Sequence, residues 1–203
     1  MDTAPISRGS VLGLVLLSEA VLAVLALCIG WVLAEPPLAR ISWTAAAAWQ
    51  GALAAVPMVV LLLLMHRWPV GPLRSLMELV ERQLVPHLRA CTLADIALIS
   101  LVAGLGEELL FRGVLQTAMT RLTGSTWLAI AITAVAFGAV HAVSVTYFLL
   151  AGIIGAYLGW LFVFSGNLLP PILTHAIYDF AALVYLLRIE TRPIRDDLSA
   201  ESP

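Results

Sequence analysis

The stretch GLGEELLFRG, residues 104–113, places three charged side chains inside an otherwise apolar segment. On an α-helix Glu108 and Arg112 lie four residues apart on one face, with the acid on the N-terminal side, which is the better order for an ion pair. Glu107 points about 100° away from Glu108 and is free to face another partner. The stretch therefore predicts a helix in which an arginine holds one acid and the other acid is available.

The rest of the chain has the composition of a membrane protein. Of its 203 residues, 61% are hydrophobic and 12% are charged, where soluble domains have about 25% charged residues. A soluble domain of this size cannot bury so much apolar surface, so the apolar faces must contact lipid. The 11 basic residues, all arginine, are scattered among 13 acids, which excludes a nucleic-acid binder. Cys28 and Cys91 lack the number and spacing of a disulfide framework or a thiolate metal site.

Apolar runs long enough to cross a bilayer recur along the whole chain. A bilayer core takes roughly 20 apolar residues per helix, and runs of this kind cover residues 11–34, 44–65, 92–122, 126–143, 147–164 and 168–187. The expected fold class is therefore all-α: a polytopic membrane helical bundle of about six transmembrane helices plus one amphipathic interfacial helix.

The amphipathic helix is expected between the second and third spans, where residues 66–90 are too charged to cross the membrane. In this connector apolar side chains recur at steps of three and four residues opposite charged ones, a pattern typical of a helix lying on the membrane surface. The alternative is a solvated connector. The apolar side chains are Leu73, Leu76, Met77, Val80 and Leu84, and the charged ones are Arg74, Glu78, Glu81 and Arg82.

Six spans would put both termini on one side of the membrane. That side would hold eight arginines, while only Arg40 and Arg121 would lie on the other. The positive-inside rule then places both termini in the cytoplasm. The use of arginine alone, together with many alanines and leucines, is typical of GC-rich bacterial genomes and indicates a bacterial inner membrane. The eight are Arg8, Arg67, Arg74, Arg82, Arg89, Arg188, Arg192 and Arg195.

Ionisable side chains inside spans are functional candidates, because a charge at the middle of a spanning helix costs about 2.5–3.5 kcal/mol on insertion scales. His175 and Asp179 are four residues apart, so the acid can hydrogen-bond one imidazole nitrogen and fix the ring. His141 lies on a neighbouring helix at about the depth of Glu107. Glu19 has no companion at helical spacing and is expected to snorkel or to be neutral.

These charged pairs resemble the three motifs of the CPBP intramembrane protease family, which includes the CAAX prenyl endopeptidases and the bacterial Abi proteins. The matching residues are Glu107 and Glu108 followed by Arg112, then Phe137 with His141, then His175 with Asp179. The resemblance covers residues 94–187 and departs at its last position, which is often Asn in the prenyl endopeptidases.

No repeat or second domain is visible, so the sequence predicts one integral-membrane domain over residues 1–203. Residues 1–92 would hold two spans and the connector, residues 93–188 the catalytic core, and residues 189–203 a flexible tail. The resemblance implies an intramembrane endopeptidase that hydrolyses a peptide bond of a membrane-associated substrate.

The residues themselves suit peptide hydrolysis. Glu107, helped by His141, is placed to act as general base on a water. His175, oriented by Asp179, would stabilise the oxyanion, while the pair of Glu108 with Arg112 would hold the helix. No Ser or Cys pairs with these residues, so a covalent acyl-enzyme is not expected.

Three alternatives concern a metal ion and the class of protein. Metal-free catalysis is favoured, but Glu107, His141 and His175 offer a zinc site, although Glu107 cannot easily serve as both ligand and base. The competing class is a non-enzymatic membrane protein, either a proton-coupled transporter or an immunity scaffold. The expected partners are membrane lipid and a peptide or protein with a membrane-associated or C-terminal segment, whose lipidation the sequence leaves open.

Overall fold

The computed structural model describes residues 7–68 and 70–190, and throughout this part of the chain the regular elements are helices. The expected all-α bundle is therefore confirmed. Helix α9 includes the first two residues of the expected tail 189–203, and the remainder of that tail lies outside the described residues.

Four of the six expected spans correspond to helices that are long and apolar enough to cross a membrane. These helices begin and end within a few residues of the apolar runs in the sequence. They are α1 (Arg8–Val32), α2 (Ala45–Arg67), α8 (Val145–Ser165) and α9 (Leu169–Glu190).

The other two expected spans differ from the prediction. The third is a long helix made of α5 (Leu93–Glu108), the π-helix η2 (Leu109–Gln116) and α6 (Thr117–Thr123), and the charged motif lowers its hydropathy. The fourth is α7 (Thr126–Val140), whose 15 residues reach about 22 Å, short of a hydrocarbon core of about 30 Å. By length and composition, the described residues hold four spans, or five if residues 71–88 and 93–123, bent by 116°, form one broken span. The sequence predicted about six spans.

The connector forms the helix that the sequence predicts. It consists of α3 (Gly71–Gln83) and the short α4 (Val85–Leu88). Leu76 is buried on the inner face of α3, whereas Arg74 and Arg82 are exposed. This division confirms the amphipathic character of the helix, and its position on the membrane surface stays a prediction.

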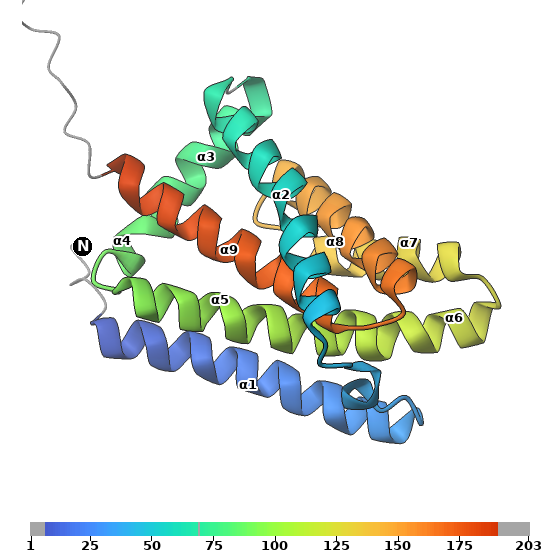
Figure 1. Cartoon of the computed structure of the whole chain (residues 1–203). Helices are drawn as coiled ribbons and strands as arrows, with labels where there is room; N and C mark the ends of the chain where they lie inside the picture. The colour runs from blue at the N-terminus through green and yellow to red at the C-terminus, as the bar shows by residue number, and fades with distance from the viewer. Residues whose placement is uncertain (1–6, 69, 191–203) are drawn as a thin grey trace, which may run out of the picture.

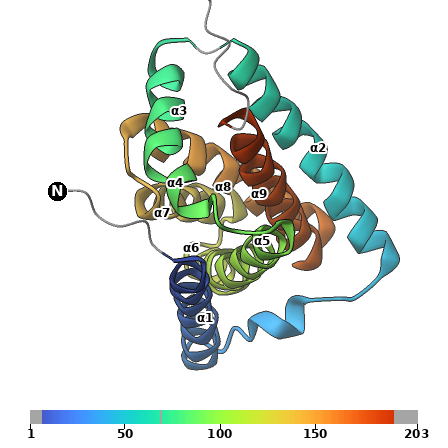
Figure 2. The ribbon, with the colours of Figure 1, turned by 90° about the vertical axis from the view of Figure 1, so that its left-hand side faces the viewer.

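Helix α9 runs between α2 and α5 and packs on both (Figure 1). Helix α1 lies along the outer side of α5 in the same direction, and α7 packs against α8 (Figures 1 and 2). Arg8 ties the starts of α1 and α5 together, because its guanidinium donates to both carboxylate oxygens of Asp95 at 2.7 and 2.8 Å.

Glycines set the distance of α5 from its two neighbours. A Cβ at Gly104 would lie 2.9 Å from the carbonyl oxygen of Ile172 on α9, and one at Gly106 would lie 2.9 Å from that of Glu19 on α1. Small residues allow such close approach of helix backbones in membranes. The acidic pair that follows Gly106 is therefore held close to both α1 and α9.

Candidate active site

Glu108 and Arg112 form the buried ion pair that their spacing predicts. The Nη1 group of Arg112 donates to Oε1 of Glu108 at 2.6 Å, and the two side chains are 1% and 0% exposed. The Nη2 group donates to the carbonyl oxygen of Gly155 on α8 at 3.0 Å. The guanidinium also lies 4.6 Å from the ring centroid of Phe137 on α7. Arg112 therefore joins the charged helix to α7 and α8.

His175 on α9 binds the same carboxylate oxygen. Its Nδ1 donates to Oε1 of Glu108 at 2.9 Å, while its Nε2 lies 3.4 Å from Oδ2 of Asp179. The sequence predicted the contact with Asp179 but not the one with Glu108, because helical spacing says nothing about residues on different helices. Glu108 therefore links the arginine of its own helix to the histidine of another.

His141 faces Glu107 from the end of α7. It was expected inside the span 126–143, but the helix ends at Val140 and His141 is the residue that follows. Its Nδ1 donates at 2.8 Å to the carbonyl of Phe137, one of the last carbonyls that lack a helical partner. Since a carbonyl only accepts, Nδ1 carries the hydrogen. The Nε2 atom lies 3.7 Å from Oε2 of Glu107, too far for a hydrogen bond.

The backbone changes from α to π helix directly after the acidic pair. The π-helix η2 extends from Leu109 to Gln116, and the hydroxyl of Thr117 donates at 3.1 Å to the carbonyl of Arg112. Short π-helical segments occur frequently at functional sites. No residue type in this stretch signals a π-helix, so the sequence could not predict it.

Four of the six predicted site residues line one cavity of about 530 Å³. The wall around it is mainly apolar and comes from α2, α3, α8 and α9. Tyr147, Tyr178 and His66 also line it, and the sequence did not single them out for the site; it assigned His66 to the connector. The four predicted residues are Glu107, His141, His175 and Asp179.

Glu108 and Arg112 do not line the cavity, since both are fully buried behind it. Glu19, which the sequence left without a companion, lies on α1 against Gly106. Its buried Oε2 has no hydrogen-bond partner among the described residues. The structure thus places a further intramembrane acid beside the motif helix.

The sequence offered Glu107, His141 and His175 as a zinc site, and His175 has other partners in the structure. Both ring nitrogens of His175 face carboxylates, so the ring would have to leave Glu108 or Asp179 to bind a metal ion. Among residues 7–68 and 70–190, no group of three or more His, Cys, Asp or Glu side chains is arranged to hold a metal.

Oε2 of Glu107 and Nε2 of His141 can hold a water molecule between them. Oε2 of Glu107 is buried and, within the described part of the chain, has no hydrogen-bond partner. The neutral imidazole of His141 with its hydrogen on Nδ1 leaves Nε2 as an acceptor. A water donating one hydrogen to each acceptor would keep its lone pairs free for attack on a carbonyl carbon.

In a comparison with protein families, residues 89–181 match a family model. The family is described as type II CAAX prenyl endopeptidase Rce1-like. The matched segment includes all six predicted site residues, but not α1 or α2. No curated protein and no solved structure matches the chain.

Proposed function

We propose that this chain, whose residues 89–181 match a model of the CAAX prenyl endopeptidase family, is an intramembrane endopeptidase with Glu107 as general base. The family indicates a protease, and the apolar helices make the chain an integral membrane protein. Beyond the family, we propose which residues catalyse the reaction, by which mechanism, and on which class of substrate.

The observation that carries the proposal is the position of Oε2 of Glu107, which has no hydrogen-bond partner among the described residues and lies 3.7 Å from Nε2 of His141 in the cavity wall. A water between them would lose a proton to the carboxylate of Glu107 as its oxygen attacks the peptide carbonyl carbon. Glu107 would then return that proton to the leaving amine. General acid-base catalysis of this kind contributes about 10²–10⁴-fold to a rate.

His175 is placed to stabilise the oxyanion of the tetrahedral intermediate. As the imidazolium, His175 donates from Nδ1 to Glu108, and its second donor, Nε2–H, is shared between Asp179 and the oxyanion. Tyr147, whose ring meets that of His141 edge-on at 6.0 Å, would bring a second donor to the same cavity wall. Donors fixed in a water-poor site contribute more than donors in water, since they need no reorganisation.

Glu108 and Arg112 act as positioning residues in this scheme. Neither lines the cavity, so neither would contact substrate. Arg112 balances the charge of Glu108, and Glu108 sets the position of the His175 ring. A buried carboxylate with two donors on one oxygen is a rigid support for the ring.

The substrate we propose is a peptide with an apolar, membrane-associated segment. The cavity is mainly apolar away from the site residues, and α2 and α9 supply leucines and methionines to its wall. The family description refers to CAAX prenyl endopeptidases, so a prenylated C-terminal segment is the first substrate to test.

The test is cleavage by purified protein in lipid nanodiscs, with peptide products identified by mass spectrometry. Prenylated and unprenylated peptides with the same C-terminal sequence are compared. Glu107→Gln keeps the shape of the side chain but removes the base, so cleavage should fall at least 100-fold while the melting temperature stays unchanged.

Glu78→Gln is the matched control, because Glu78 is an exposed acid of α3 paired with Arg74 at 3.3 Å. This variant should cleave like the wild type. Cleavage by Glu107→Gln at more than a few per cent of the wild-type rate would refute the role of Glu107.

A further inference from the structure

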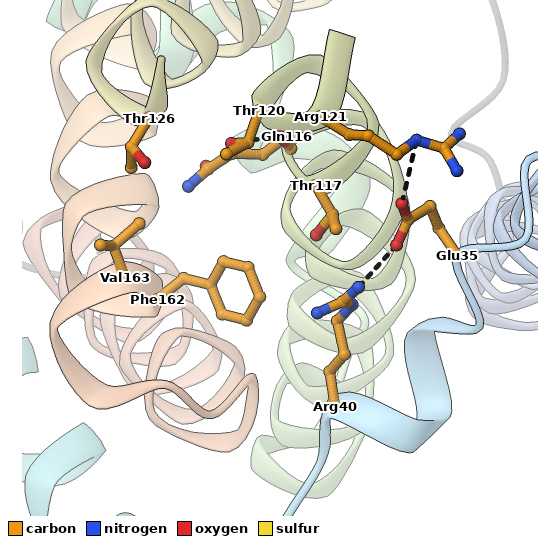
Figure 3. Close-up of a pocket in the computed structure, with 9 residues that line it drawn as sticks. All are labelled: Glu35, Arg40, Gln116, Thr117, Thr120, Arg121, Thr126, Phe162 and Val163. Atoms are coloured by element: carbon orange, nitrogen blue, oxygen red, sulfur yellow. Dashed lines mark hydrogen bonds and ion pairs between the residues drawn. The ribbon is translucent and has the colours of Figure 1, made fainter. Parts of the chain in front are cut away.

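A second cavity, of about 350 Å³, lies between the α1–α2 connection, the η2–α6 helix and α8 (Figure 3). It shares none of its described lining residues with the first. The connection contains the short 3₁₀ helix η1 (Pro37–Arg40). The polar lining consists of Glu35, Arg40, Gln116, Thr117, Thr120, Arg121 and Thr126.

Two arginines meet one carboxylate in this cavity. Glu35 is 6% exposed, accepts from Nη2 of Arg40 at 2.6 Å and lies 3.6 Å from Nε of Arg121. Figure 3 shows the two guanidinium groups reaching Glu35 from opposite sides. The group therefore has one positive charge in excess. These are the two arginines that the sequence placed on the membrane side opposite the other eight.

The cavity also contains one donor and one acceptor that nothing satisfies. Nε of Arg40 and Oε1 of Gln116 are buried and have no hydrogen-bond partner in the described residues. Gln116 is 1% exposed, and its Nε2 donates to the carbonyl of Gly159 at 3.0 Å, which fixes the orientation of the amide. Leaving a buried polar group unsatisfied is unfavourable, so a ligand that supplies both partners would be favoured.

Exposed tryptophans mark the level of this cavity in the membrane. Trp31 near the end of α1 is 85% exposed, Trp43 just before α2 is 77% exposed and Trp127 at the start of α7 is 71% exposed. The elements that carry them adjoin the cavity. Tryptophans on the lipid-facing surface concentrate at the headgroup level of a bilayer. The cavity is therefore at the depth of phospholipid headgroups.

We propose that this cavity binds the headgroup of a membrane phospholipid. The phosphodiester accepts from Arg40 and Arg121, and a hydroxyl or ammonium hydrogen of the headgroup donates to Oε1 of Gln116. The acyl chains leave past Phe162 and Val163, the apolar part of the lining. Glycerol and ethanolamine headgroups supply the donor, whereas choline has none. The excess positive charge favours the anionic glycerol headgroup.

The test is thermal unfolding of delipidated full-length protein in detergent with added short-chain lipid. A ligand that binds only the folded state raises the melting temperature with its concentration. Dihexanoyl phosphatidylglycerol should raise it most, phosphatidylethanolamine less and phosphatidylcholine least. Inorganic phosphate at the same concentration should have little effect, because it lacks the acyl chains.

Two variants test the contacts of Gln116 and of Arg121 with the headgroup separately. Gln116→Met keeps the volume of the side chain but loses the acceptor, so the preference of the ethanolamine lipid over the choline lipid, two headgroups of equal net charge, should disappear. Arg121→Gln, on a largely exposed side chain, should weaken binding of the glycerol lipid at least tenfold. Arg74→Gln, a change of the same kind on α3, is the control and should bind like the wild type.

Equal effects of the glycerol and choline lipids on the wild-type protein would overturn the proposal. A rise in melting temperature with inorganic phosphate as large as the rise with lipid would also overturn the proposal, because the cavity would then be a site for free anions. If Gln116→Met does not fold, the lipid series measured on the wild type and on Arg121→Gln still tests headgroup binding.

Discussion

Glu108 supports the proposed site although it does not face the cavity. Its Oε1 accepts from both Arg112 and His175, so one carboxylate oxygen joins two helices. Replacing it with an amide affects both partners at once. The arginine keeps its charge in a buried position without a counter-charge, and the imidazole keeps only a neutral amide oxygen as acceptor in place of the carboxylate.

Glu108→Gln should therefore lower stability as well as activity. Breaking a buried ion pair from one side costs about 3–5 kcal/mol, which the melting temperature in detergent reports. Glu78→Gln breaks an exposed pair of the same spacing, and its effect should stay within about 0.5 kcal/mol. A melting temperature unchanged by Glu108→Gln would argue against the buried pair.

Asp179 calls for a different test, since it lines the cavity and faces Nε2 of His175 at 3.4 Å. In the proposed scheme its negative charge supports a cationic ring that stabilises the oxyanion. Asp179→Asn removes that charge and should reduce the cleavage rate. Rates measured from about pH 5 to 9 check this, and full activity with an unchanged pH profile would contradict the proposed role.

The sequence predicted the contacts within one helix better than those between helices. Helical spacing was sufficient for the pair of Glu108 with Arg112 and for the approach of His175 to Asp179. The shared depth of Glu107 and His141 came from counting residues away from a turn. The bond from Glu108 to His175 joins residues 67 positions apart, and only the packing of α5 on α9 brings them together.

At the scale of elements, the close packing of α5 and α9 decides where His175 lies. Gly104 sits at this contact, and a Cβ there would lie 2.9 Å from the carbonyl oxygen of Ile172 and 3.0 Å from the nitrogen of Ala176. Backbone atoms cannot move aside as side chains do, so any Cβ at this position must push the two helices apart.

Gly104→Ala should thus lower both stability, by about 1–3 kcal/mol, and the cleavage rate. Gly13→Ala is the control, because a Cβ at Gly13 on α1 meets nothing within 4 Å. Melting temperature and cleavage rate are measured for both variants. If the two alanine variants behaved alike, the spacing of α5 and α9 would not limit the site.

The ends of elements were less predictable than their existence. Apolar runs and the amphipathic pattern gave the right order of helices from the first to the last. The π-helix had no signal, because it depends on backbone hydrogen bonds rather than on residue type. The expected fourth span continued past Val140 because Ala142 and Val143 are apolar, whereas the chain turns at His141, whose Nδ1 caps the carbonyl of Phe137.

At the scale of the whole molecule, the start of α1 and the end of α9 lie together. Val11 packs in one cluster with Leu88, Leu183 and Leu187, so the two ends of the described chain share one end of the bundle. Arg40 and Arg121 meet at the other end, around Glu35. The side of the membrane that each end faces stays a prediction.

The central claim is that a carboxylate, without a metal ion, activates the water. The most direct measurement is the cleavage rate of protein dialysed exhaustively against a chelator, together with elemental analysis of the same sample. We predict an unchanged rate and well under one zinc per chain, because His175 is held by Glu108 and Asp179. Stoichiometric zinc that is lost in His141→Ala, with activity restored only when metal is added back, would contradict the claim.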